Sequence, residues 1–85
     1  MPLEVVWTDK AKKGLKALDK PVAARIFGKV EELGGSETVF LEKVTGHDFY
    51  KFRVGNYRVL IDKLPATKKL FILKVGHRKN VYQNL

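Results

Sequence analysis

The sequence predicts one α+β domain in which a two-helix hairpin covers one face of a mainly antiparallel sheet. Three observations support this prediction. A short β-rich segment comes first, two helical patterns follow it, and strand-like segments fill the second half. With 85 residues, 45% of them hydrophobic, the chain can build one core but not two. We therefore expect residues 1–85 to form a single domain whose other sheet face is open.

The chain is expected to begin with a strand that leads directly into a helix. Residues 3–8 contain Val, Val and Trp in succession, which favours a strand. Thr8 or Asp9 can then cap a helix, because both side chains accept hydrogen bonds from a first helical turn. Apolar residues at positions 11, 15 and 18 give this helix one apolar face, and Gly14 weakens it.

A second helix is predicted to start at the segment Asp19-Lys20-Pro21, because proline is tolerated in a first helical turn. Apolar residues at positions 22, 26, 30 and 33 continue one face, and Gly34-Gly35 ends the helix. Residues 39–44 then predict a short strand, although the apolar run 39–41 also fits the end of a helix or a loop.

The clearest local pattern is a hairpin of two strands, residues 50–54 and 57–61. Gly55-Asn56 is a two-residue turn signal, and closing the turn there sets Arg53 opposite Arg58. The apolar side of the hairpin is expected to pack under the helices, with Tyr50, Phe52, Val54, Tyr57, Val59 and Ile61. After a turn at residues 64–67, the apolar run 70–76 predicts an interior strand, and residues 77–85 follow as a polar tail.

Positive charge gathers on the other side of this hairpin. Lys51 and Arg53 alternate with the apolar residues of their strand and therefore point away from the helices. Two arginines directly opposite each other destabilise a sheet, so stability alone would not select Arg53 facing Arg58. Residues 43–85 contain ten basic and two acidic residues, which accounts for the whole net charge of +8. An anionic partner is predicted, and Lys74 joins this face if the strand register holds.

Several kinds of site are excluded or disfavoured. The chain has no cysteine, which rules out disulfides and thiolate metal sites. His47, expected in a turn, and His77 do not make a metal site by their spacing, so we expect no metal and no cofactor. The N-terminal segment does not resemble a signal peptide and no run is long enough to span a membrane, which favours a cytoplasmic protein. Six aromatic residues are expected in the core: Trp7, Phe27, Phe40, Phe49, Phe52 and Phe71.

Two segments, YKFRVGNYRV at residues 50–59 and VGHRKNVY at residues 75–82, resemble the RelE/ParE toxin superfamily of toxin-antitoxin systems. The similarity is greatest to its RelE-like mRNA interferase branch and extends over nearly the whole chain. It implies a RelE-like fold and a cognate antitoxin as partner. It also implies a ribosome-dependent endoribonuclease that cleaves mRNA in the ribosomal A site and inhibits translation, with no small-molecule cofactor.

Carried over by position, the resemblance implies catalytic roles for Lys51, Arg58, Arg78 and Tyr82, with Arg53 as a further RNA contact. The expected RNA-binding set is Lys51, Arg53, Lys74, His77 and Lys79. Arginine is suited to stabilise the negative charge that develops at phosphorus during cleavage, because its planar guanidinium group can bind two phosphate oxygens and stays charged. The proton acceptor stays open between Lys51, Tyr82 and His77, and Tyr82 could instead stack on the target base or serve as a packing lid.

Two other functions are compatible with these residues. A ParE-like toxin would inhibit gyrase through protein contacts and would have no nuclease activity. A noncatalytic RNA-binding module would use the same positive face only as an electrostatic footprint. The arginine and tyrosine of the segment 77–82 favour the RNA-cutting branch of the superfamily.

Overall fold

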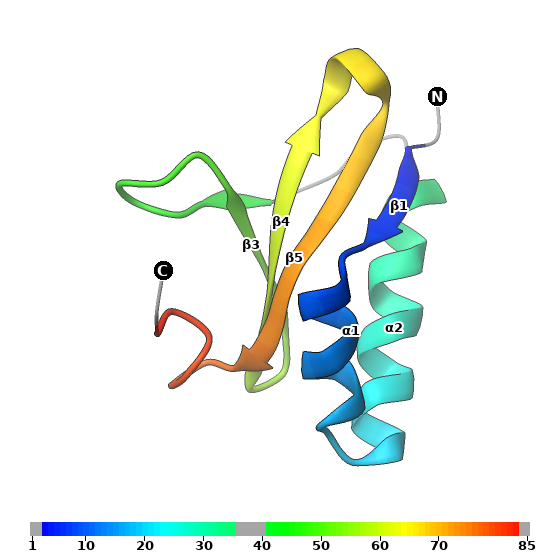
Figure 1. Ribbon diagram of the computed structural model, residues 1–85, viewed down its shortest axis with the longest axis vertical. Coiled ribbons are helices and arrows are strands. Elements are labelled where there is room, and N and C mark those ends of the chain that lie inside the picture. The colour runs from blue at the N-terminus through cyan, green and yellow to red at the C-terminus, as the bar shows by residue number, and fades with distance from the viewer. Residues whose placement is uncertain (1–2, 36–40, 84–85) are drawn as a thin grey trace.

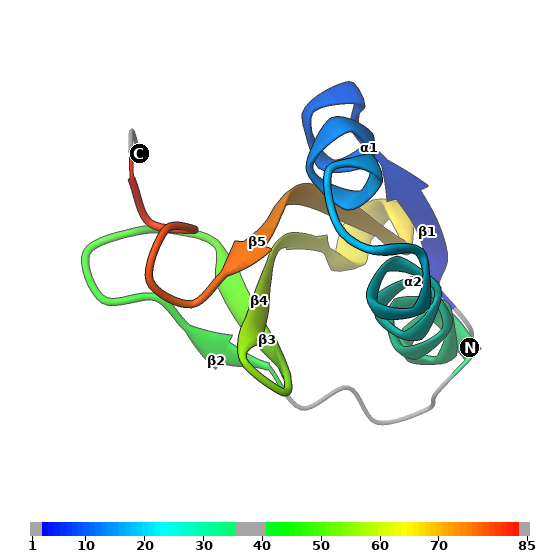
Figure 2. The same ribbon diagram turned by 90° about the horizontal axis from the view of Figure 1, so that it is seen from below.

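A computed structural model describes residues 3–35 and 41–83, which form one five-stranded sheet with two helices against one of its faces (Figures 1 and 2). The strand order is β1-β5-β4-β3-β2. The elements are β1 Glu4–Trp7, α1 Asp9–Lys16, α2 Lys20–Gly35, β2 Glu42–Lys43, β3 Tyr50–Val54, β4 Tyr57–Leu64, a 3-10 turn Pro65–Thr67 and β5 Lys69–His77. The predicted α+β class, with the helical hairpin on one face of the sheet, is confirmed.

Helix α1 is fixed onto β5 at both of its ends. The Thr8 side chain caps the helix by accepting a hydrogen bond from the Ala11 N–H at 3.2 Å, and its hydroxyl donates to the Ile72 carbonyl oxygen at 2.6 Å. Farther along the helix, a Cβ built on Gly14 would lie only 2.6 Å from the Val75 carbonyl oxygen. Gly14 weakens the isolated helix, as predicted, but it is also what allows α1 to lie this close to β5.

The sheet is mixed, because β1 pairs with β5 in parallel whereas the three other strand pairs are antiparallel. Strand β5 is an interior strand between β1 and β4, as its apolar run predicted. Strand β2 contains only two residues, and Val39 and Phe40 of the predicted strand lie outside the described residues. No helix of the described residues is long and apolar enough to cross a membrane.

The core lies between the helices and the sheet. Its buried residues are Ala11, Ile26, Val30, Val54, Val59, Ile61, Leu70, Ile72 and Val75. Phe52, Tyr57 and Trp7 pack against this cluster. Phe27 does not belong to it, which corrects the prediction: its side chain is 45% exposed and stacks on Trp7 with 5.3 Å between ring centroids. Phe27 follows buried Ile26 and is therefore turned about 100° away from the buried side of α2.

Three more of the aromatic predictions need comment. Phe71 pairs with Asp62 and is half-buried outside the core cluster, so its assignment to the core is wrong. Phe49 is half-buried next to β3 and stacks on His47 with 4.8 Å between ring centroids. His47 lies in a turn, as predicted, and its N–H donates to the Val44 carbonyl oxygen at 3.1 Å. Phe40 lies outside the described residues.

The face of the sheet away from the helices is not open along its whole length, which corrects a second prediction. Leu60 and Val81 are each only 1% exposed, yet neither belongs to the core cluster between helices and sheet. A Cβ built on Gly76 would lie 3.7 Å from the Cα and Cβ of Val81, so residues after β5 fold back onto this face. Figure 2 shows this C-terminal turn, residues 78–83, on the opposite side of the sheet from α1 and α2.

Candidate nucleic-acid interface

Three neighbouring strands place four basic side chains on the sheet face away from the helices. We call these residues, Lys51, Arg53, Arg58 and Lys74, the basic face. Arg53 pairs with Arg58 across the β3–β4 hairpin, as predicted. Lys51 pairs with Leu60, and Leu60 in turn pairs with Lys74 on β5. Paired residues in an antiparallel sheet share a face, so the register gathers these cations on one surface.

Lys74 reaches the basic face because of a bulge in β5. Ile72 pairs with Ile61, and Lys74 pairs with Leu60. Because Leu60 and Ile61 are consecutive in β4, Leu73 is an extra residue in β5 with no paired residue in β4. Regular alternation would have put Lys74 on the same face as buried Ile72. The bulge reverses the alternation, which sends Val75 into the core and Lys74 to the opposite face.

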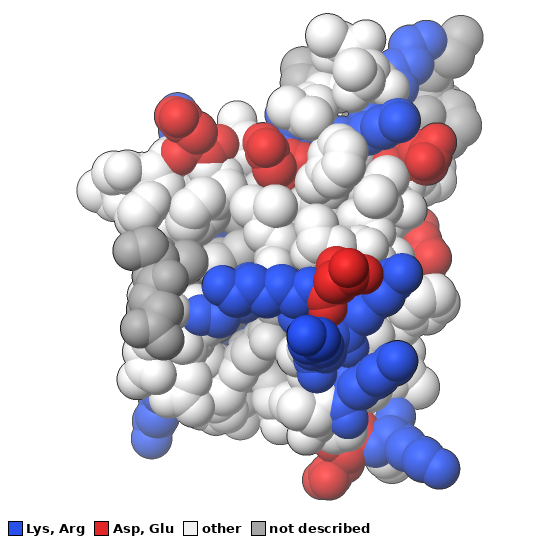
Figure 3. Space-filling model, viewed as in Figure 1, with Lys and Arg blue, Asp and Glu red and all other residues white. Residues whose placement is uncertain are grey.

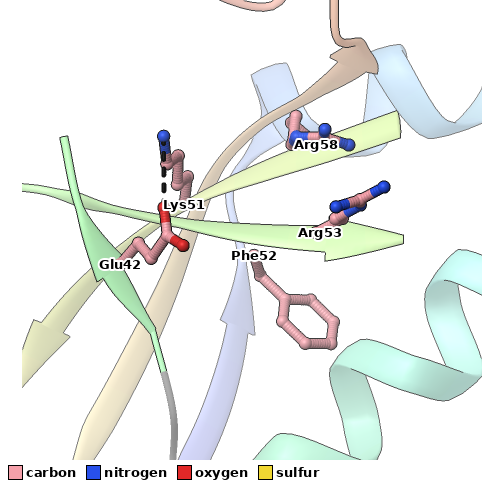
Figure 4. A pocket seen from close by; sticks show the side chains of 5 residues that line it. All are labelled: Glu42, Lys51, Phe52, Arg53 and Arg58. Carbon is pink, nitrogen blue, oxygen red and sulfur yellow. Dashed lines mark ion pairs between the residues drawn. The ribbon is translucent and has the colours of Figure 1, made fainter. Parts of the chain in front are cut away.

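A hollow of about 290 Å³ lies at the hairpin, lined by Glu42, Lys51, Phe52, Arg53 and Arg58 (Figure 4). Of these residues, Phe52 points to the helix side and packs against the core. The Lys51 ammonium forms an ion pair with Glu42, with 3.3 Å between Nζ and Oε2. Glu42 pairs with Lys51 in the β2–β3 register and therefore points to the same face. Glu42 was not among the predicted site residues, because nothing local in residues 39–44 indicates which residue faces Lys51.

Arg58 is held in place by its own turn. Its Nη1 donates hydrogen bonds to the carbonyl oxygens of Tyr57 at 2.8 Å and Gly55 at 3.0 Å. A guanidinium group has five N–H donors, and Nη1 carries two of them. The side chain is thus oriented before any ligand arrives, and three donors on Nε and Nη2 are left for an anion.

Arg78 and Tyr82 are brought close to this hairpin by the C-terminal turn. The Arg78 N–H donates to the Asn56 carbonyl oxygen at 2.9 Å, which ties the start of the turn to the β3–β4 connection. The N–H groups of Asn80 and Val81 then donate to the His77 carbonyl oxygen at 2.8 and 2.9 Å. The Arg78 side chain is exposed, and Tyr82 is 38% exposed. Both predicted residues are therefore accessible, on a turn whose start is tied to the β3–β4 connection.

His77 occupies a different surface from the basic face. It pairs with Tyr57, which packs against the core on the helix side, and the two rings meet edge to face with 5.6 Å between centroids. Its Nδ1 accepts a hydrogen bond from the Lys79 N–H at 3.2 Å. The register thus separates His77 from Lys51 and Arg53, whereas Lys79 is exposed in the turn that follows.

Lys74 carries the one resolved pKa shift among the described residues. Burial lowers the pKa of the Lys74 ammonium, and the positive charge of Lys10 lowers it further. Its Nζ donates to the Gln83 carbonyl oxygen at 2.6 Å.

Figure 3 shows Lys and Arg side chains gathered, with an acidic group among them, over the region that α1 and β5 occupy in the same view of Figure 1. In the part of the chain that the structure describes, no three His, Asp or Glu side chains come together as a metal site would require.

Comparison with known proteins gives both a family and a set of similar folds. The model of the family described as ParE toxin of type II toxin-antitoxin system, parDE, matches residues 5–82. The toxin-antitoxin complex RelBE2 from Mycobacterium tuberculosis aligns with a TM-score of 0.80 at 22% identity, covering 92% of this chain and 100% of that one. A search of curated proteins found no match.

Two further solved structures show the same arrangement. A mutant of the Escherichia coli toxin RelE in the free state aligns with a TM-score of 0.76 at 22% identity, over 93% of this chain and 86% of that one. The RelB-RelE antitoxin-toxin complex from Methanococcus jannaschii aligns with a TM-score of 0.73 at 28% identity, over 94% and 98%. The order of strands and helices described above is therefore that of RelE toxins.

Proposed function

The chain belongs to the ParE toxin family of type II toxin-antitoxin systems, within the RelE/ParE superfamily, and on this basis we propose that it is a RelE-like mRNA interferase. In this proposal it is a ribosome-dependent endoribonuclease that cuts mRNA in the ribosomal A site and so inhibits translation. The single observation that carries the proposal is the Arg53–Arg58 pair on an accessible face, with Arg58 already oriented by its turn and Arg78 tied to that same turn.

The reaction requires charge stabilisation at phosphorus. The 2′-hydroxyl oxygen bonds to the adjacent phosphorus as its proton leaves to a base, and the bond from phosphorus to the 5′-oxygen breaks as that oxygen takes up a proton. The products are a 2′,3′-cyclic phosphate and a 5′-hydroxyl. Arg58 and Arg78 are assigned to the phosphate oxygens on which negative charge develops, because preorganised cations stabilise that charge without first having to reorient.

Proton transfer is assigned to the ion pair in the hollow. The Glu42 carboxylate can accept the 2′-hydroxyl proton, and the Lys51 ammonium can supply a proton to the leaving 5′-oxygen. This assignment differs from the sequence-based hypotheses, which left the proton acceptor open between Lys51, Tyr82 and His77; an ammonium paired with a carboxylate is a proton donor. Tyr82, four residues after Arg78 and 38% exposed, is proposed to stack on or orient the target base.

RNA binding is proposed for the residues that surround this centre. Lys51 and Arg53 line the hollow, and exposed Lys79 extends the positive surface beyond it. The geometry gives little support to the predicted contribution of His77, which lies on the helix side of the sheet. Lys74 shares the basic face, but its ammonium already binds Gln83.

Two partners follow from the proposal. The ribosome would supply the bound and shaped message, in the cytoplasm. A cognate antitoxin is proposed because the similar solved structures include RelB-RelE complexes. An acidic or amphipathic antitoxin segment laid against the helices or the basic face would neutralise the toxin.

Primer extension on ribosomes programmed with a defined message tests the proposal. The purified chain is expected to cut at A-site codons. Arg78→Ala and Glu42→Gln should each lower the cleavage rate about 100-fold or more, because each removes a group needed in the transition state. Tyr82→Phe, which keeps the ring, isolates the contribution of the hydroxyl. Lys29→Ala is the matched charge control, since Lys29 lies on helix α2 and pairs with Glu32 at 3.9 Å. An intact message with the unmodified chain would refute the nuclease assignment.

Gyrase inhibition is the second candidate, and the description of the matching family as ParE toxin favours it. A gyrase supercoiling assay at increasing toxin concentration decides this point. Inhibition together with an uncut message would establish a ParE-like activity. If neither activity is found, RNA binding alone can be measured against salt, with an expected log-log slope of roughly −0.7 per phosphate contacted on a single strand.

A further inference from the structure

The C-terminal turn, which carries Arg78 and Tyr82, is attached to the sheet at three points. At its start, the Arg78 N–H binds the Asn56 carbonyl oxygen at 2.9 Å. In its middle, Val81 is 1% exposed and packs on Gly76. At its end, the Gln83 carbonyl oxygen accepts a hydrogen bond from Lys74 Nζ at 2.6 Å. The first attachment holds the backbone at Arg78, and the second and third hold the two residues on either side of Tyr82, Val81 and Gln83.

The bond between Lys74 and Gln83 has the features of a strong one. It is short, and an ammonium donor makes it charge-assisted, which roughly doubles the strength of a neutral hydrogen bond. Lys74 is half-buried and pairs with Leu60, which is 1% exposed, whereas its hydrogen bond to Gln83 is itself exposed.

We propose that Lys74 is a positioning residue, whose hydrogen bond to Gln83 holds the C-terminal turn against the basic face and so keeps Tyr82, the residue before Gln83, in place. This inference rests on the proposed nuclease function, and it assigns Lys74 a role through Tyr82 and Arg78 instead of a direct contact with RNA. The bulge at Leu73 is needed for this positioning role, because it turns Lys74 toward the C-terminal turn.

Kinetics on programmed ribosomes separate positioning from charge. Lys74→Met removes the donor and keeps a long unbranched side chain, so the expected result is a fall in kcat of about tenfold or more with KM changed less than about twofold. Lys74→Arg, which restores a charged donor, should recover most of the lost rate. Lys10→Met is the matched control, because it removes the neighbouring charge without removing the donor to Gln83, and it should leave kcat unchanged.

A second measurement needs no activity. Amide hydrogen exchange at Gln83, whose N–H binds the Asn80 carbonyl oxygen at 3.1 Å, reports how firmly the end of the turn is held. Lys74→Met should speed this exchange about tenfold or more and leave exchange at Arg78 nearly unchanged, whereas Lys10→Met should change neither.

The outcomes are distinct. Unchanged exchange at Gln83 in Lys74→Met overturns the inference, as does an equal rise of KM in Lys74→Met and Lys10→Met with kcat preserved, which would make Lys74 a simple RNA contact. If the unmodified chain cuts and Lys74→Met cuts equally fast, the positioning role fails while the nuclease function stands. If the unmodified chain does not cut, the proposed function fails, and with it the catalytic role of Lys74; the exchange rates then decide only whether Lys74 holds the turn.

Discussion

The two faces of the sheet differ in the kind of side chain that they carry. On the helix side the core is entirely apolar, and among the described residues no polar or charged one is buried. On the other side four cations share a surface with only two fully buried residues, Leu60 and Val81. Burial of apolar area stabilises the first face, whereas like-charge pairs weaken the second. The comparison indicates that folding relies mainly on one face; in the proposed function, the other face binds an anionic ligand.

The largest effect on stability is expected from a comparison of two neighbouring residues of β4. Ile61 points into the core, and Leu60 points to the basic face. Ile61→Ala should lower the free energy of unfolding by about 2–5 kcal/mol, a large part of the roughly 5–15 kcal/mol typical of a domain. Leu60→Ala should cost less, because the cover over it is a single turn that can shift to fill the space. Urea denaturation of both variants measures the difference, and equal losses would mean that both faces support the fold equally.

A second test compares two helical glycines. A Cβ at Gly14 would meet the Val75 carbonyl oxygen at 2.6 Å, whereas a Cβ at Gly28 would meet nothing within 4 Å. Gly14→Ala should therefore destabilise the protein by about 1–3 kcal/mol, despite the higher helix propensity of alanine. Gly28→Ala should stabilise it by about 0.5–1 kcal/mol. Thermal unfolding of the two variants compares them directly, and a stabilising Gly14→Ala would show that α1 can move away from β5 without loss.

The smallest effect is expected on the basic face. Arg53→Thr removes one member of the Arg53–Arg58 pair and puts a good strand former in its place. The free energy of unfolding should rise by about 0.2–1 kcal/mol, and the gain should shrink as salt screens the repulsion. The same variant should bind RNA less tightly. Denaturation at low and high salt measures the gain, and a loss of stability that salt does not affect would argue against repulsion between the arginines.

Local patterns in the sequence predicted much of this molecule. Strand alternation and the Gly55-Asn56 turn were sufficient to place Arg53 opposite Arg58, and residue type restricted the cap of the first helix to Thr8 or Asp9, of which the structure has Thr8. Both depend on residues close together in the chain, where backbone geometry leaves few choices. The basic character of the hairpin face was predictable for the same reason.

Features that depend on distant residues were not predictable in this way. Whether Glu42 meets Lys51 depends on the pairing of a two-residue strand, and the position of Lys74 depends on the bulge at Leu73. The same is true of two other contacts, the parallel pairing of β1 with β5 and the packing of Val81 on Gly76. In both, the sequence pattern of one segment does not indicate which other segment it will contact. Phe27 was misplaced because an apolar residue one step from a buried position is still read as part of the apolar face.

The pairing of β1 with β5 also bears on how the protein is made. Glu4 meets Lys69 and Trp7 meets Ile72, so the first strand has no neighbour in the sheet until the last strand has been synthesised. Contacts between such distant residues form late and slow folding, because a long loop must close first. A nascent chain that has emerged only as far as β4 lacks both Lys74 and β5, the strand that joins β1 to β4. The order of synthesis thus delays completion of the basic face until β5 has emerged.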